Sequence, residues 1–294
     1  MSISRRRILT GASAALLTPA LSGLSLAARP GLIPESELAM IEARSAGRMG
    51  LAILDTQDGR GNSWNGSSRF ALSSTFKFLL AGAVLMRADA GQERLNRQVA
   101  VPAAGLVPWS PATKLQAGGT MSVHALCDAA VTLSDNTAAN LLLETMGGPE
   151  GFTQLLRESG DAVTRLDRIE PSLNEAAPGD PRDTTTPEAM LHGMQRLLLG
   201  DVLRPASRQL LAGLLRSNTT GGSRIRAGLP GDWQAGDKTG TGGNGAVSDI
   251  AILYPPGRAP VLIAAYFQDS LRPREDLDVL HAELGRLTAA YVMI

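Results

Sequence analysis

The sequence predicts a mixed α/β (α+β) fold, in which an antiparallel sheet is flanked by helices and carries an inserted all-α lobe. Strand-like segments occur towards the two ends of the chain, whereas its middle shows helical periodicity. The 294 residues are 44% hydrophobic, which is enough for a large core. A strand from the N-terminal part can join the C-terminal strands in one sheet, so the helical middle becomes an insertion.

The first half of the chain holds one clear strand and several helices. The apolar segment at 48–55 reads as a strand, and a helix is predicted from about Ser74. Residues 91–120 are rich in proline and glycine, so we expect them to be mostly loop. At 122–134 the apolar residues recur with helical spacing, and Cys127 lies on that apolar stripe. We therefore expect Cys127 to pack in the core.

The second half contains further helices, a long loop and the remaining strands. Helices are predicted over 136–148, 149–160, 187–200, 204–217 and 274–292, and strands over 232–242, 246–256 and 259–269. The Pro-Pro-Gly-Arg stretch at 255–258 is typical of a hairpin connection. Residues 164–186 have no sustained period, and so long a loop in a compact protein is usually functional or disordered.

The chain divides into an export signal and one mature domain. Residues 1–27 hold an arginine cluster and a short Ala/Leu stretch, which indicate a twin-arginine type signal peptide. Residues 28–294 are predicted to form the mature domain. Its α/β lobe covers about 28–64 and 216–294, and its all-α lobe about 65–215. We expect a cleft between the lobes and a periplasmic location in a Gram-negative bacterium, reached through the twin-arginine export machinery.

Composition argues against several classes of function. The 28 basic and 28 acidic residues balance, which gives no reason to bind nucleic acid or, after processing, a membrane. The single cysteine and three histidines are not at metal-ligand spacing. We therefore expect no metal and no cofactor, and we expect a monomer because no segment suggests an assembly interface.

Ser74 and Lys77 form an S-x-x-K pair in an apolar stretch. Between Thr75 and Met86, every residue apart from Thr75 and Lys77 is apolar or glycine, and a helix that is apolar on all sides is buried. A lysine there is costly unless it is paired or used, and burial lowers its pKa and makes it a better base. Ser74 lies one turn away on the same face, so the pair supplies a nucleophile and a base.

Two other short motifs complete a set. The S-D-N at 134–136 lies between two predicted helices and can cap the second one. The K-T-G at 238–240 ends a predicted strand in a glycine-rich stretch that is typical of an anion site. Asp237 separates Gly236 from Lys238, which breaks the spacing of a nucleotide phosphate loop and argues against a nucleotide site.

In this order, S-x-x-K, S-D-N and K-T-G resemble the motif set of class A β-lactamases and penicillin-binding proteins. A fourth element at 165–174, with Glu170 and Asn174, resembles the loop that carries the deacylating glutamate of class A enzymes. The resemblance covers essentially the whole mature chain. It implies a β-lactamase/transpeptidase-like fold. The implied function is hydrolysis of the β-lactam ring of penicillins and cephalosporins through a serine acyl-enzyme, giving antibiotic resistance.

The resemblance also implies roles for individual residues. The expected catalytic residues are the nucleophile Ser74, Lys77, the proton relay Ser134 and the water-activating Glu170. Backbone N–H groups of Ser74 and Thr241 are the expected oxyanion hole. Substrate contacts are expected from Trp109, Asn136, Asn174, Arg224, Lys238, Thr239, Gly240 and Thr241. Whether Lys77, or Glu170 through a water, accepts the proton in acylation stays open.

The loop and the glycines have expected supporting roles. Arg168 and Asp183 resemble the pair that clamps the neck of the loop, and Glu170-Pro171 matches the cis peptide of the family. Gly240, Gly242 and Gly243 are expected to let the strand edge approach the substrate closely.

Some positions bear on the choice of substrate. Trp109 falls at an aromatic gatepost of the cleft. Arg224, with Arg226 as an alternative, matches a second cation for the substrate carboxylate. Trp109, Arg224 and Thr241 resemble the carbapenem-hydrolysing branch, but Ser73 and Gly242 occupy the positions of its disulfide. The sequence therefore leaves carbapenem hydrolysis open.

Two other functions use the same three motifs or the same ligands. A cell-wall D-Ala-D-Ala carboxypeptidase or transpeptidase acylates at the same serine, but Glu170 and Asn174 argue against it. A non-catalytic β-lactam sensor usually needs a membrane segment or partner domain, and neither is visible in the sequence.

Overall fold

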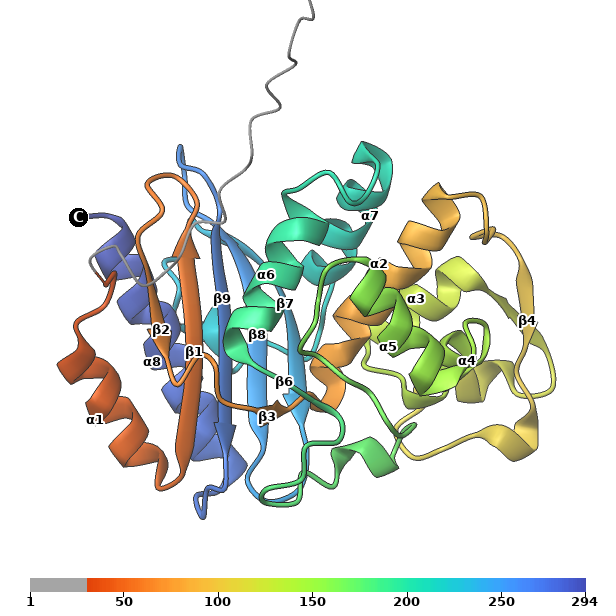
Figure 1. The fold of residues 1–294 in the computed structure, drawn as a ribbon, viewed down its shortest axis with the longest axis horizontal. Coiled ribbons are helices and arrows are strands. Elements are labelled where there is room, and N and C mark those ends of the chain that lie inside the picture. The colour runs from red at the N-terminus through yellow and green to blue at the C-terminus, as the bar shows by residue number, and fades with distance from the viewer. Residues whose placement is uncertain (1–30) are drawn as a thin grey trace, which may run out of the picture.

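Five strands form one antiparallel sheet in the order β2-β1-β9-β8-β7 (Figure 1). The computed structural model describes residues 31–294, so the predicted signal peptide at 1–27 lies outside the described residues. The strands are β1 (Arg48–Asp55), β2 (Gly61–Trp64), β7 (Gln234–Thr241), β8 (Val247–Tyr254) and β9 (Val261–Gln268). β1 pairs with β9 along its whole length. The prediction that the N-terminal strand joins the C-terminal strands is confirmed.

Successive residues of the central strands enter opposite cores, because side chains alternate across a strand. In β8, Ile250 and Ile252 pack on one side, and Ala251 and Leu253 on the other. Helices α1 (Glu35–Ser45) and α8 (Arg274–Val292) contribute to the same core as Ala251. Helices α6 (Pro187–Leu198) and α7 (Pro205–Arg216) contribute to the core that contains Ile250. The sheet is therefore covered by helices on both faces (Figure 1).

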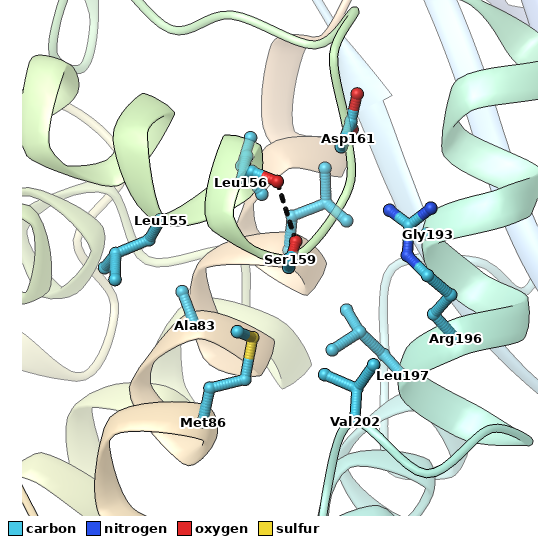
Figure 2. Close-up of a pocket in the computed structure, with 11 residues that line it drawn as sticks. Ala83, Met86, Leu155, Leu156, Ser159, Asp161, Gly193, Arg196, Leu197 and Val202 are labelled. Atoms are coloured by element: carbon cyan, nitrogen blue, oxygen red, sulfur yellow. Dashed lines mark hydrogen bonds between the residues drawn. The ribbon is translucent and has the colours of Figure 1, made fainter. Parts of the chain in front are cut away.

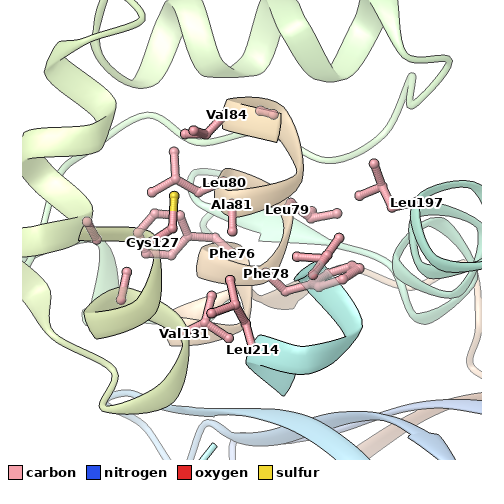
Figure 3. Close-up of a cluster of buried hydrophobic side chains, with 14 of the residues drawn as sticks. Phe76, Phe78, Leu79, Leu80, Ala81, Val84, Cys127, Val131, Leu197 and Leu214 are labelled. Atoms are coloured by element: carbon pink, nitrogen blue, oxygen red, sulfur yellow. The ribbon is translucent and has the colours of Figure 1, made fainter. Parts of the chain in front are cut away.

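Helix α2 (Phe76–Asp89) lies inside the helical part of the molecule. All residues from Phe76 to Leu85 are buried, which confirms the prediction from its apolar sequence. Figure 3 shows its side chains meeting those of neighbouring helices, including Cys127 and Leu214. Cys127 is buried as expected, and burial raises the pKa of its thiol to about 12. The neighbours are α3 (Val123–Thr132), α4 (Asn136–Glu144), α5 (Gly148–Glu158) and α7.

Short elements connect the longer ones. β3 (Phe70–Ala71) pairs with β6 (Thr184–Thr185), and β4 (Gln98–Ala100) pairs with β5 (Thr120–Ser122). Single 3₁₀ turns lie at Ser73–Thr75, Ala103–Gly105, Thr113–Gln116, Ser172–Asn174 and Ile225–Gly228. The segment expected to be a long loop at 164–186 thus holds one 3₁₀ turn and one short strand. Because β3 pairs with β6, the end of this loop is tied to the segment just before Ser74.

The predicted helices and strands are present with small differences at their ends. The helix expected from about Ser74 begins with the 3₁₀ turn at Ser73–Thr75. Helix α1 and strand β2 are two elements that the sequence patterns did not indicate. No helix within residues 31–294 has both the length and the apolar character needed to cross a membrane. The lobe boundaries near 64 and 216 stay predictions.

Candidate active site

A cleft of about 580 Å³ brings most of the predicted site residues together. It is lined by Ser74, Trp109, Ser134, Asn136, Asn174, Thr219, Thr220, Arg224, Thr239, Thr241 and Arg274. These residues come from segments that are far apart in the sequence, among them the 3₁₀ turn before α2, the start of α4, the long loop, the edge strand β7 and the start of α8. Lys77, Glu170 and Lys238 are fully or almost fully buried next to the lining residues.

Lys77 is the hub of the polar contacts below the cleft. Its Nζ lies 2.9 Å from Ser74 Oγ, 2.8 Å from the Ser134 carbonyl oxygen and 2.6 Å from Asn136 Oδ1. It also forms an ion pair with Glu170 Oε1 at 3.0 Å. Burial lowers the pKa of Lys77, and the Glu170 carboxylate opposes that shift. The amine is therefore tuned towards proton acceptance while it touches the Ser74 hydroxyl.

Ser134 connects the two buried lysines. Its Oγ lies 3.1 Å from Lys238 Nζ and 3.4 Å from Lys77 Nζ. Burial, followed by the nearby charge of Lys77, lowers the pKa of Lys238 to about 7. A hydroxyl between two amines whose pKa values are both lowered by burial is suited to relaying protons. The next residue, Asp135, caps α4 by accepting from Ala138 N, as the S-D-N motif predicted.

Glu170 is held from two sides in the buried end of the long loop. Asn174 Nδ2 donates to Glu170 Oε2. The backbone of Glu170 makes two hydrogen bonds of 2.9 Å with the side-chain amide of Asn140 on α4. The Glu170-Pro171 peptide is cis, as expected from the resemblance. The carboxylate is thus fixed beside Lys77, and Asn174 Oδ1 next to it is buried without a protein partner.

Arg168 and Asp183 form an ion pair that spans the neck of the loop. Arg168 Nε lies 2.6 Å from Asp183 Oδ2. Asp183 Oδ1 accepts from the backbone N–H groups of Asp167 and Arg168 at 2.7 and 2.9 Å. The Asp183 side chain is 1% exposed, whereas Glu175, which also pairs with Arg168, is 56% exposed. Three charge-assisted hydrogen bonds therefore converge on one buried carboxylate at the place where the loop closes.

Strand β7 passes very close to the segment that carries the nucleophile. A Cβ atom added at Gly240 would lie 3.1 Å from the Leu72 carbonyl oxygen, and one at Gly242 would lie 2.7 Å from Ser73 Oγ. The glycines of the K-T-G stretch were expected to admit the substrate. In the structure, Gly240 and Gly242 leave room for the chain around Ser73, which sets the distance between β7 and the 3₁₀ turn that holds Ser74. Close approach of the substrate itself stays a prediction.

Arg224 lies inside this wall and is 4% exposed. Its Nε pairs with Asp278 at 2.7 Å, and its Nη2 donates to Thr241 Oγ1 at 2.8 Å. Its Nη1 donates to the carbonyl oxygens of Gly240 and Ser248. The alternative residue, Arg226, pairs with the buried Asp237 and does not line the cleft. Between the two arginines, Arg224 is thus the one that reaches the cleft wall.

Trp109 and Asn136 also line the cleft. Trp109 is 66% exposed and has a left-handed backbone with φ of 60°, and its indole N–H donates to the Leu133 carbonyl oxygen. An exposed indole at the rim fits the expected gatepost. The Asn136 amide donates to the Pro108 carbonyl oxygen at 2.9 Å while it accepts from Lys77.

The arrangement matches a known family along almost the whole chain. The model of the family described as "Beta-lactamase enzyme family" matches residues 34–292. A solved structure of an ancestral class A β-lactamase is 56% identical, has a TM-score of 0.86, and the match covers 87% of this chain and 98% of that one. This chain belongs to the class A β-lactamase family.

Curated relatives agree with this assignment. The β-lactamase L2 of Stenotrophomonas maltophilia is 44% identical over 97% of this chain and 98% of its own. The β-lactamase AST-1 of Nocardia asteroides is 45% identical over 87% of this chain and 82% of its own. As a class A β-lactamase, the protein is a hydrolase of the β-lactam ring, and the resemblance inferred from four motifs is confirmed.

Two contacts in this β-lactamase were not predicted from its sequence. Asn140 lies one helical turn after Asn136, so α4 bonds Lys77 with one amide and Glu170 with the next. Their i, i+4 spacing within Asn-Thr-Ala-Ala-Asn was the available signal. Thr220 Oγ1 lies 2.6 Å from Thr239 Oγ1 and so touches the K-T-G threonine from a neighbouring segment. No local pattern indicates that second contact.

A second hollow of the β-lactamase lies away from the catalytic residues. Figure 2 shows it between α2, α5 and α6, with apolar side chains such as Met86 and Leu155 around it. Its volume of about 10 Å³ holds at most one water molecule. It is therefore a packing defect of the helical core and does not compete with the 580 Å³ cleft as a substrate site.

The clamp at the loop neck gives one testable prediction. Asp183→Ala removes the buried acceptor of three hydrogen bonds, and we expect it to lower the free energy of unfolding by about 3–5 kcal/mol. Glu175→Ala removes an exposed partner of the same arginine, and we expect it to lower the free energy of unfolding by at most about 1 kcal/mol. Urea unfolding of both variants measures the difference. If the two variants lose the same free energy of unfolding, the buried ion pair contributes no more to stability than the exposed one.

Proposed function

We propose that this β-lactamase hydrolyses penicillins and cephalosporins through an acyl-enzyme at Ser74. One observation carries the proposal: Ser74, Lys77 and Glu170 are linked by contacts of 2.9 and 3.0 Å at one end of the cleft. A nucleophile, a buried amine and a carboxylate are the groups needed to form an ester with the enzyme and then to hydrolyse it.

The first step is acylation. Ser74 Oγ attacks the carbonyl carbon of the lactam, and its proton goes either to Lys77 Nζ or through a water to Glu170. The carbon–nitrogen bond of the ring then breaks, and Ser134 Oγ gives its proton to the departing ring nitrogen. Lys77 and Lys238 both lie near Ser134 Oγ and can restore that proton. The lowered pKa values of both lysines support these transfers.

The second step is deacylation. Glu170 takes a proton from a water, which attacks the ester carbonyl, and the Ser74–acyl bond breaks as Ser74 Oγ regains a proton. Asn174 supports this role, because its amide donates to Glu170 and its buried Oδ1 is free to accept a hydrogen bond from that water. The clamp of Arg168 and Asp183 keeps the loop closed over the site.

Substrate binding uses the remaining lining residues and the buried Lys238 beside them. Lys238, Thr239 and Thr241 face the carboxylate on the fused ring, and Arg224 orients the Thr241 hydroxyl. The backbone N–H groups of Ser74 and Thr241 form the oxyanion hole, and one such donor contributes about 3 kcal/mol.

Asn136 donates to the amide of the substrate side chain, and Trp109 closes the rim. Gly240 keeps β7, with Thr239 and Thr241, close to the segment that holds Ser74.

The fixed Glu170 also separates this function from that of a cell-wall carboxypeptidase, which forms the same ester. A carboxylate held against Lys77 and Asn174 favours fast release of the acyl group. We further propose that the mature chain begins near residue 28, is exported by the twin-arginine route to the periplasm and acts there as a monomer.

Steady-state kinetics on a penicillin, a cephalosporin and a carbapenem tests the function. We expect full turnover of the first two, with many product molecules formed per enzyme, and slow turnover of the carbapenem. One equivalent of product followed by arrest with the penicillin would contradict the proposal and would favour a carboxypeptidase-like or sensor protein.

A further inference from the structure

Arg274 is a cation at the cleft, and none of the sequence motifs indicated a role for it in the site. It is the first residue of α8 and lines the cleft with Thr239 and Thr241. Its side chain is 57% exposed, and its contacts are with Glu275 at 3.0 Å and Asp278 at 3.8 Å. The guanidinium group is therefore held loosely enough to turn towards a ligand.

The other cations of the same wall are already engaged. The guanidinium group of Arg224 donates hydrogen bonds to Asp278, Thr241 and two carbonyl oxygens, and the residue is 4% exposed. Lys238 is fully buried and bonds Ser134. Among the described residues that line the cleft, Arg274 is thus the cation with an exposed charge.

Helix stability gives only a small reason for an arginine at this position, because its i,i+4 partner Asp278 is 3.8 Å away. The N-terminal turn of a helix favours acidic side chains and disfavours cations, because the unpaired N–H groups give it a partial positive charge. Glu275 and Asp276 follow this rule in the same turn, whereas Arg274 departs from it. The cost of the departure suggests that the charge acts on something outside the helix.

A chain of contacts fixes where a ligand of Arg274 would lie. Arg274 and Arg224 share Asp278, and Arg224 bonds the Thr241 hydroxyl. Under the proposed function, the carboxylate of the substrate ring faces Thr239 and Thr241. A group on the ring carbon next to the carboxylate-bearing carbon would then point towards the Arg274 side of the cleft.

We propose that Arg274 is a specificity residue that favours β-lactams with a second anionic group beside the ring carboxylate. In a cephalosporin this group is the substituent on the six-membered ring, adjacent to the carbon that bears the carboxylate. A negative substituent gains an exposed ion pair with Arg274, a neutral one gains nothing, and a positive one is repelled. The inference rests on the proposed function, because it uses the expected orientation of the substrate.

The test compares three cephalosporins that share one nucleus and one amide side chain and differ only in this substituent. The substituent is an anionic carboxymethyl group, a neutral methyl group or a cationic quaternary ammoniomethyl group. The variants are Arg274→Gln, Arg274→Lys and, as the matched control, Arg272→Gln. Arg272 is also exposed near the start of α8, pairs with Asp276 and does not line the cleft.

We expect Arg274→Gln to raise KM for the anionic substrate about three- to five-fold. KM for the neutral substrate should stay unchanged, and KM for the cationic substrate should fall. Arg274→Lys should keep the order of the wild type, and Arg272→Gln should change none of the three. The discrimination should shrink at high salt, because an exposed charge is screened.

Other outcomes separate the two proposals. If wild-type enzyme turns over all three substrates and Arg274→Gln changes them by the same factor, the specificity role is wrong and the proposed function stands. If wild-type enzyme turns over none of them, the proposed function fails and this inference fails with it.

Discussion

Replacing Ser74 with alanine is expected to lower β-lactam turnover by at least about 10⁴-fold, because no other group can form the acyl-enzyme. The fold should survive, since Lys77 keeps the Ser134 carbonyl oxygen, Asn136 and Glu170 as partners. Hydrolysis of a chromogenic cephalosporin measures the loss, and intact-protein mass measures whether any covalent adduct forms.

Ser73 provides the matched control for this experiment. It is the adjacent residue, and its Oγ is buried without a hydrogen-bond partner. Its backbone φ of 41° is left-handed, a conformation in which alanine and serine are strained to a similar extent. We expect Ser73→Ala to keep turnover within a few-fold of wild type. Retention of more than about 1% of activity in Ser74→Ala, against the expected 10⁴-fold loss, would refute Ser74 as the nucleophile.

Changing Glu170 to glutamine is expected to trap the acyl-enzyme. Glutamine keeps the size of the side chain but cannot take a proton from water, and loss of a general base slows a step by about 10²–10⁴-fold. Intact mass after mixing with a penicillin should show the protein plus one whole substrate molecule. The exposed Glu175 on the same loop is the control, and Glu175→Gln should show no lasting adduct.

The acylation rate of Glu170→Gln also addresses which group accepts the Ser74 proton. The Glu170 carboxylate holds the pKa of Lys77 up, so its removal lets burial lower that pKa further. If Lys77 is the base, adduct formation should stay fast while its release becomes slow. If Glu170 acts through a water, both steps should slow together. Release of the adduct at the wild-type rate would exclude Glu170 from water activation.

Features that depend on local sequence were predicted well. Asp135 caps its helix by a contact three residues away, and the apolar run after Ser74 could only form a buried helix. By contrast, α1 buries little beyond Leu38 and Ile41, and β2 has four residues, so neither has enough periodic signal to be recognised.

The parts of the site that escaped prediction rely on contacts between distant segments. Asn140 bonds Glu170 across 30 residues, and the pairing of Arg224 with Asp278 spans 54. The motif at Arg224 predicted a cation for the substrate, but only the packing of α8 against β8 and the turn at Ile225–Gly228 reveals that Arg224 is paired with Asp278. A motif fixes which residues gather at a site, whereas the partners brought by the fold decide which charges remain available.

The pairing of β1 with β9 has a consequence for how the chain is made. β1 is one of the earliest segments to leave the ribosome, yet the strand that pairs along its full length is almost the last. The order of synthesis therefore leaves β1 with only the short β2 beside it until translation is nearly complete. The helices in the middle of the chain can pack against one another before then. Contacts so distant in sequence slow folding, and an unpaired apolar strand invites aggregation. Chaperone protection of the nascent chain is thus most needed between the synthesis of β1 and that of β9.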